Sequence, residues 1–393
     1  MLHLDDYDMS EARGFLCRFN ANQVTLTGDL ATVRDVALSL PKVLPTGRVR
    51  AHVLEHVPLI ELPLERMSDA EARICMLHYS FLVQAFVWGG DEAAEVLPAC
   101  LAIPISALAD HLGQQPLMPY SAYVLDNWGL IDPTGSVELG NIHTLQSFFN
   151  GQDENWFVLT HVAIEATAGK ALAAFGPLIE ASHEENVATT RARLEEVGTT
   201  WKTINSIFDR IPERCDPNIF FDQLRPYLHG WKDNPALPNG IVYEGVEQYA
   251  AEPQAFRGET GSQSSIIPAM DALMGVGHAS DPLKDYLDEL HIYRPPAHRR
   301  FIDDTRAESR LRAFVERAGD RDLTEAYNSI IQSMADFRTR HLEYAARYIN
   351  KQSRASAGND TGLGTGGTPF MRYLKKHRNE TAARLISPTA NAA

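Results

Sequence analysis

Arg338 and His341 stand out because both lie near the apolar face of one long amphipathic pattern. Between residues 322 and 349, apolar side chains recur at steps of three and four, which gathers them on one side of a helix. Asp322 and Glu325 have the spacing of a capping box and predict where this helix begins. The pattern turns the imidazole of His341 inward. An inward arginine one turn earlier requires an anion that the helix itself does not supply.

A lone inward histidine beside an arginine meets the needs of a haem site. The porphyrin provides four ligands to its iron, so the protein has to give one axial imidazole and a cation for a propionate. The alternative interpretation of His341 is a packed core histidine with satisfied ring nitrogens. A second arginine, Arg225, lies in a segment that also holds Phe220 and Phe221.

Other motifs that carry chemistry are weak or missing from the sequence. Gly362, Gly364 and Gly367 satisfy the GxGxxG spacing, but no strand precedes them as a dinucleotide site requires. The sequence has no GK[ST] loop, no HExxH or His/Cys cluster and no GxSxG elbow. These absences argue against a Walker nucleotide site, metal chelation by several side chains and a serine triad.

A glycine-rich segment over residues 356–368 precedes the last predicted helix. Five glycines fall between residues 358 and 367, and Thr368 stands at the expected helix start. Such a segment can act as a hinged lid whose backbone N–H groups and threonines close over a ligand. The alternative is a disordered linker without a role.

Composition excludes several classes of protein. The chain has 393 residues, 44% of them hydrophobic, which is enough for a sizeable core. Its formal charge of −15 and the lack of a dense basic stripe predict no nucleic-acid partner. The four scattered cysteines and the lack of a signal-peptide pattern predict a reduced, cytoplasmic protein. The apolar run over 74–88 is shorter than the ~20 residues that cross a bilayer, which predicts a buried helix and no membrane contact.

The hydrophobic pattern predicts a mainly α fold with two domains. We expect a small mixed or α domain over residues 1–150 and a large all-helical domain over 151–393, because long helical patterns begin after the turn-rich FFNGQDEN. Helices are predicted over 157–180 and 182–211, and Ser68 and Glu71 form a capping pair before the buried helix. A long loop is expected over 234–265.

Several ordered strings give the chain a resemblance to a known family. FFDQLRPYLHGWKDNP, GIVYEG, GSQSS, RPPAHRRFI, RHLEYAARYI and GTGGTPFMRYLKKHRNET resemble, in order and spacing, the indoleamine 2,3-dioxygenase family of haem enzymes. The similarity covers roughly residues 75–385. It implies a helical haem-binding domain that uses haem b and O2 to cleave the pyrrole ring of tryptophan, giving N-formylkynurenine, in a cytoplasmic enzyme of tryptophan catabolism by the kynurenine pathway.

The resemblance also implies roles for individual residues. His341 matches the proximal iron ligand, Arg338 the residue that meets a propionate, and Asp271 a carboxylate that orients the proximal imidazole. Arg225 matches the arginine that binds the substrate carboxylate, which suits its planar guanidinium. The predicted catalytic residues are Thr160, His161, Arg225 and Thr365. The predicted substrate contacts are Tyr120, Tyr123, Trp156, Phe157, Phe220, Arg225, Thr260, Thr365 and Gly366.

The distal side of the expected pocket departs from the family pattern. Tyr120, Tyr123, Trp156 and Thr160 stand where mammalian members have Tyr, Cys, Phe and Ser, and Tyr123 and Trp156 are expected to reshape the indole slot. Because the alignment is offset by up to one residue here, either Thr160 or the adjacent His161 faces the bound gas.

Three functions fit these observations. The leading hypothesis is a dioxygenase acting on L-tryptophan or a close indole, with an electron donor that keeps the haem ferrous. The alternatives are a haem-dependent indole monooxygenase of the same superfamily and a non-catalytic haem sensor.

Overall fold

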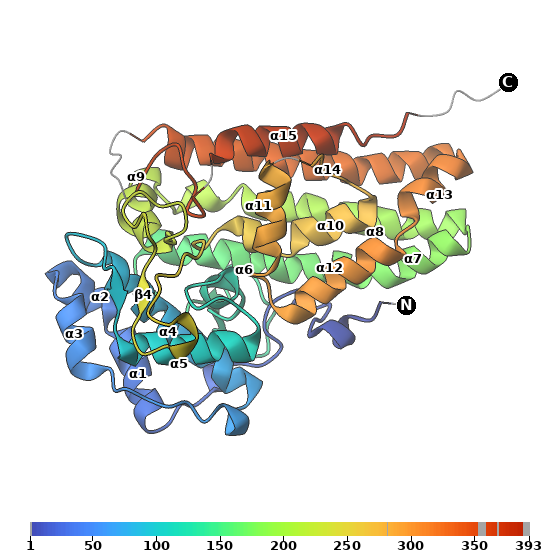
Figure 1. Cartoon of the computed structure of the whole chain (residues 1–393). Coiled ribbons are helices and arrows are strands. Elements are labelled where there is room, and N and C mark those ends of the chain that lie inside the picture. The colour runs from blue at the N-terminus through green and yellow to red at the C-terminus, as the bar shows by residue number, and fades with distance from the viewer. Residues whose placement is uncertain (1, 281, 353–358, 368, 388–393) are drawn as a thin grey trace.

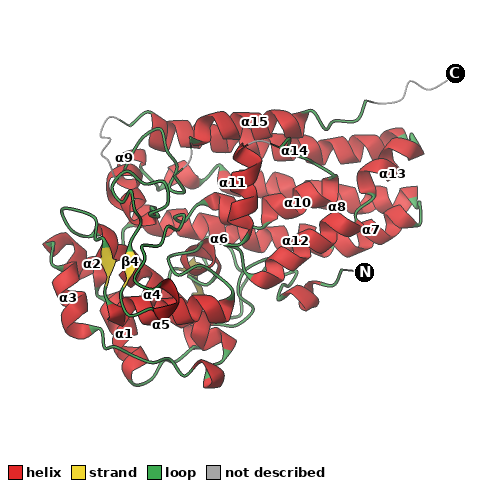
Figure 2. Ribbon diagram, in the orientation of Figure 1, coloured by secondary structure: helices red, strands yellow, loops and turns green. Residues whose placement is uncertain are grey.

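Helices make up most of the computed structural model, which describes residues 2–280, 282–352, 359–367 and 369–387 (Figure 2). The four longest are α4 (Asp69–Trp88), α6 (Gln152–Ala173), α8 (Val187–Phe208) and α14 (Arg321–Ala345). The predicted mainly α fold is confirmed. The shorter helices are α1 (Asp29–Leu38), α2 (Leu40–Val43), α3 (Val49–His56), α5 (Ala99–Leu112), α7 (Phe175–His183), α9 (Pro217–Ile219), α10 (Ile266–Met274), α11 (Pro282–His291), α12 (Pro296–Glu308), α13 (Leu311–Ala318) and α15 (Phe370–Ala382).

The strands of the described residues are short and form two small sheets. Strand β1 (Val96–Leu97) pairs in parallel with β4 (Val242–Tyr243), and β2 (Gly129–Leu130) pairs antiparallel with β3 (Ile142–His143). The β1–β4 pair joins the N-terminal part of the chain to the segment predicted as a long loop, which therefore contains a strand. Each of these sheets joins only two short segments, and most contacts between elements are contacts between helices.

Long helices lie side by side along the C-terminal part of the molecule. Figure 1 shows α6, α8, α14 and α15 running together, with α14 packed against both α8 and α15, and with α1 to α5 gathered at one end. Buried side chains from both predicted domains belong to one hydrophobic cluster. The boundary at residue 150 stays a prediction.

Helix starts follow side-chain caps, though not always the predicted ones. Ser68 caps α4 in a complete capping box with Glu71, as predicted. The prediction for α14 was wrong by two residues, because Asp320 rather than Asp322 accepts the backbone N–H of Leu323, at 2.8 Å. A π-helical segment, Ala346–Asn350, continues α14.

The helix predicted over 157–180 is two helices. The first, α6, begins earlier, at Gln152, and α7 restarts at Phe175 after a break at Ala174. Pro177 lies in the first turn of α7, where its missing N–H group is tolerated, whereas it would interrupt a continuous helix. The helix predicted over 182–211 begins later, at Val187, with Asn186 as its cap.

One stretch, Gln152–His183, is long and apolar enough to cross a membrane by length and composition. Of its most apolar window, 78% is buried inside the protein. This burial is what a core helix shows, since α6 packs against α8 and α7. All four cysteines are free thiols.

Candidate functional site

A large cavity of about 950 Å³ lies among the long helices. Its walls come from α6, α8, α10 and α14, and from the segments 259–264 and 359–367. The volume is at the upper end of the roughly 300–1,000 Å³ typical of small-molecule and cofactor sites. Of the residues predicted for the site, those that line it are Tyr120, Phe157, His161, Phe220, Arg225, Thr260, Asp271, Arg338, His341 and Thr365.

His341 presents an unengaged imidazole to this cavity from α14. Its ring packs edge-on against Phe208, with the centroids 6.3 Å apart, and makes no hydrogen bond within the described part of the chain. Burial lowers the pKa of His341 to about 4, with smaller contributions from His161 and Arg338. The imidazole is therefore neutral at physiological pH, which is the form that binds metals. The core-histidine alternative fails on this geometry, because the ring borders open space and has no partner there.

Arg338 and Asp271 contact each other. The Nη2 group of Arg338 donates to Asp271 Oδ2 at 2.6 Å, and its Nη1 group donates to Thr381 Oγ1 and, at 3.4 Å, to the carbonyl of His377. The expectation that Asp271 holds the His341 imidazole is not met, since Oδ2 of Asp271 accepts from Arg338 and faces His278. The other oxygen, Oδ1, is buried without a hydrogen-bond partner.

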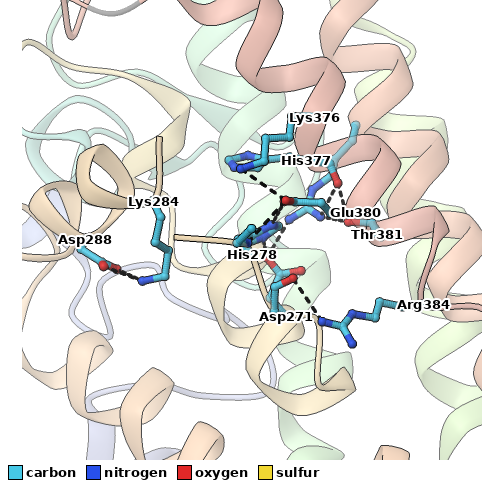
Figure 3. Close-up of polar contacts among 12 residues, drawn as sticks. Asp271, His278, Lys284, Asp288, Lys376, His377, Glu380, Thr381 and Arg384 are labelled. Carbon is cyan, nitrogen blue, oxygen red and sulfur yellow. Dashed lines mark hydrogen bonds and ion pairs between the residues drawn. The ribbon is translucent and has the colours of Figure 1, made fainter. Parts of the chain in front are cut away.

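His278, His377 and Glu380 form a cluster at the edge of the cavity that the sequence did not reveal (Figure 3). Figure 3 shows His278 between two carboxylates: its Nε2 lies 3.3 Å from Asp271 and its Nδ1 lies 2.5 Å from Glu380. One potential ligand atom from each of the three lies within 4.8 Å of the others, a spacing compatible with a metal ion.

The charges of this cluster are already compensated by the protein. Arg338 pairs with Asp271, and Lys376 lies 3.4 Å from Glu380. Both ring nitrogens of His278 also face carboxylate oxygens. A bound cation is thus not needed for charge balance, and the cluster ties α15 to the end of α10. His278 lies about 100 positions from Glu380 in sequence, so local spacing could not have joined it to His377 and Glu380.

The structure decides between Thr160 and His161. Thr160 is fully buried and turns away from the cavity, donating its hydroxyl to the carbonyl of Trp156 at 2.7 Å. His161 lines the cavity, and its Nδ1 lies 2.8 Å from the carbonyl of Phe157. Because a carbonyl only accepts, Nδ1 carries the proton and Nε2 keeps a free lone pair. Burial lowers the pKa of His161, which keeps the ring neutral.

Tyr123 and Trp156 do not shape the cavity as expected. Neither lines it; Trp156 instead contacts Arg210 and Arg214 at a separate, smaller surface pocket. Phe157, the next residue, lines the cavity one turn before His161. On α6 the cavity is therefore lined by Phe157 in place of Trp156 and by His161 in place of Thr160. Both family positions are shifted by one residue in the same direction.

Arg225 is fully buried, with its guanidinium 5.4 Å from the ring centre of Phe221. Its Nη1 group donates to Asn359 Oδ1 and its Nη2 group to the carbonyl of Leu363. Burial lowers the pKa of Arg225 to about 10, so the side chain stays cationic at neutral pH. Its Nε is buried without a partner. This arginine makes no ion pair with any residue that the structure describes.

The described part of the predicted lid, residues 359–367, lies over the Arg225 end of the cavity. Thr365 lines the cavity and donates its hydroxyl to the carbonyl of Glu259 at 2.5 Å. Gly366 does not line it, and its carbonyl accepts from Arg257 at 2.6 Å. Residues 356–358 and 368 of the predicted lid lie outside the described residues.

Two buried acids, Glu165 and Glu259, also line the cavity and were missed from the sequence. Glu165 accepts hydrogen bonds from Tyr120 at 2.9 Å and Ser264 at 2.8 Å, and burial raises its pKa to about 7. Glu259 is 3% exposed and burial raises its pKa to about 8. Glu165 follows His161 by four residues on an apolar helix, a spacing that could have revealed it. Nothing in the local sequence marks Glu259.

Comparison with known proteins gives one consistent result. The model of a family described as indoleamine 2,3-dioxygenase matches residues 3–384. Indoleamine 2,3-dioxygenase 2 of Homo sapiens is 32% identical, over 98% of this chain and 96% of that protein. Indoleamine 2,3-dioxygenase 1 of Rattus norvegicus is 33% identical, over 90% and 88%. Indoleamine 2,3-dioxygenase of Saccharomyces cerevisiae is 29% identical, over 89% and 86%.

Proposed function

The chain belongs to the indoleamine 2,3-dioxygenase family of oxidoreductases, and from this premise we propose that it uses haem b and O2 to cleave the pyrrole ring of L-tryptophan, giving N-formylkynurenine. The observation that carries this proposal is the neutral, unengaged imidazole of His341 on the wall of the about 950 Å³ cavity. An amino acid alone does not need so large a space or a metal-binding imidazole.

The residues around the cavity fit a haem group. His341 would be the axial ligand, and apolar side chains such as Ile204 and Phe208 offer a surface for the macrocycle. Arg338 would hold a propionate at the polar edge. Its bonds to Asp271, His377 and Thr381 engage three of its five N–H donors and leave others free for a carboxylate. When bound, the haem supplies the binding and activation of O2.

The protein's own residues then bind and orient the substrate. Arg225 would donate hydrogen bonds to the carboxylate, since a charge-assisted bond is stronger than its present bond to the neutral carbonyl of Leu363. Phe157 and Phe220, whose ring centres lie 5.1 Å apart, would contact the indole. The free lone pair on Nε2 of His161 would accept the indole N–H. Residues 359–367 cover the arginine and would exclude water from the closed site.

Spectra and product analysis test this proposal. Purified protein loaded with haem should show a Soret band, and incubation with L-tryptophan, ascorbate and methylene blue should yield N-formylkynurenine. A product heavier than the substrate by one oxygen would favour the monooxygenase instead. CO binding without any spectral response to indoles would favour the sensor, and the lack of a Soret band after reconstitution would refute all three.

Replacing His341 tests the predicted axial ligand. His341→Ala should abolish stoichiometric haem binding, because no other described side chain on this wall presents an unengaged imidazole beside Phe208. The measurement is haem content by pyridine haemochrome assay. His161→Ala, on α6, is the matched control and should retain haem. Normal haem content in His341→Ala would rule out the assigned ligand.

A further inference from the structure

Two groups of opposite charge type face the substrate end of the cavity without neutralising each other. Arg225 is a fully buried cation, and Glu259 is an acid with 3% exposure; both line the same cavity. Neither forms an ion pair with a described residue. Among the residues that the structure describes, the acid that acts on Arg225 is Asp360, which lies beyond ion-pair distance and is partly exposed.

Glu259 differs from the other buried acid on the same wall. Glu165 accepts hydrogen bonds from Tyr120 and Ser264. The carboxyl group of Glu259 receives no hydrogen bond from any residue in the described part of the chain, and burial alone raises its pKa. Its backbone carbonyl is engaged by Thr365, which fixes the residue at the edge of the lid segment. The side chain is thus held in place while its carboxyl group, which burial keeps mainly protonated at neutral pH, has no protein partner. A bound ammonium group would favour its ionised form.

Burying an acid and a base without counter-charges costs free energy, even though Arg225 keeps neutral hydrogen-bond partners. That cost is recovered when a ligand supplies both counter-charges. The zwitterion of an α-amino acid carries a carboxylate and an ammonium group on the same carbon. A ligand of this kind would neutralise Arg225 and Glu259 in one binding event. A neutral indole, or an indole with only one of the two charges, would leave one of them unpaired.

We propose that Glu259 binds the α-ammonium group of the substrate while Arg225 binds its carboxylate, so that the site selects zwitterionic amino acids over other indoles. This inference rests on the proposed function, because it assumes that the substrate lies in this cavity. It assigns to Glu259 a part in specificity, with no part in the oxygen chemistry. Selection of this kind works by leaving buried polar groups unpaired in the complexes of unsuitable ligands.

The test compares two ligands that differ only in the ammonium group. L-Tryptophan and indole-3-propionate are titrated into haem-loaded protein by isothermal calorimetry, with wild type and Glu259→Gln. The exchange keeps the shape of the side chain and removes its ability to ionise. Glu259→Gln should weaken L-tryptophan binding by about ten- to a hundredfold, the range for a lost charged hydrogen bond. Indole-3-propionate has no ammonium group for Glu259 to bind, so its affinity should change by no more than about twofold.

Glu165→Gln is the matched control, since it alters a second buried acid of the same cavity. It should leave the ratio of the two affinities at the wild-type value. Equal weakening of both ligands by Glu259→Gln, or an unchanged ratio, would overturn the inference. Haem stoichiometry and product analysis report on the proposed function separately. A protein that lacks turnover yet still discriminates between the two ligands through Glu259 would refute the proposed function and leave the role of Glu259 standing.

Discussion

The two ends of the cavity handle buried charge in opposite ways. At the α15 end, Arg338, Asp271, His278 and Glu380 form a chain of contacts in which each charged group faces an opposite or titratable partner. At the lid end, Arg225 and Glu259 are as deeply buried but have no ionic partner among the described residues. The charges of the first end are neutralised by the protein itself, whereas the described residues supply no counter-charge at the second.

The largest effect on stability is expected from breaking the ion pair between Arg338 and Asp271 at the α15 end. Asp271→Ala leaves the buried guanidinium of Arg338 without its carboxylate, and removing one partner of a buried pair costs about 3–5 kcal/mol. Thermal or urea unfolding of the haem-free protein measures this loss. Asp322→Ala removes an exposed ion pair with Arg191 and should cost less than about 1 kcal/mol. A similar small cost for both variants would show that the ion pair between Arg338 and Asp271 does not stabilise the fold.

A smaller effect, seen in binding, is expected from Arg225→Ala. Loss of a desolvated charged hydrogen bond should weaken L-tryptophan binding by about 1.5–3 kcal/mol. Haem content should be unchanged, because Arg225 does not contact the His341 wall. Tryptamine, which lacks the carboxylate, is the control ligand and should bind both proteins alike. Equal weakening of tryptamine would assign Arg225 a structural part instead.

A further effect is expected in how stability depends on pH. The unfolded chain ionises Glu259 near pH 4.5, whereas burial raises the folded-state pKa to about 8. Between these values the unfolded state binds fewer protons, so the contribution of Glu259 to stability falls as pH rises. Glu259→Gln should therefore become more stable relative to wild type from pH 5 to pH 8.

Glu165→Gln should show the same sign over a narrower range, because its folded-state pKa is only about 7. Unfolding temperatures of the haem-free proteins at four pH values give the comparison. A difference between Glu259→Gln and wild type that stays constant with pH would mean that Glu259 has an ordinary pKa. It would then resemble the compensated groups of the α15 end.

Predictions from local spacing succeeded where the physics is local. The buried helix after Ser68 and the inward position of His341 follow from caps and from 3.6-residue periodicity, which neighbouring residues determine. The start of α14 was missed because Asp320 and Asp322 are both adequate caps; Asp320 caps the helix, and Asp322 instead pairs with Arg191 of α8. The assignments of catalytic and binding residues stay predictions, although His161 rather than Thr160 now faces the cavity.

The sequence by itself determined the helical class and the family, because periodicity and ordered strings are properties of neighbours along the chain. The residues it assigns to an iron and to a carboxylate stay predictions. Only the tertiary structure decided which charges are neutralised. Asp271 pairs with Arg338 rather than His341, and Glu259 has no cation, because those outcomes depend on contacts between segments far apart in sequence. Burial then sets the cost of each charge, and burial is a property of the folded whole.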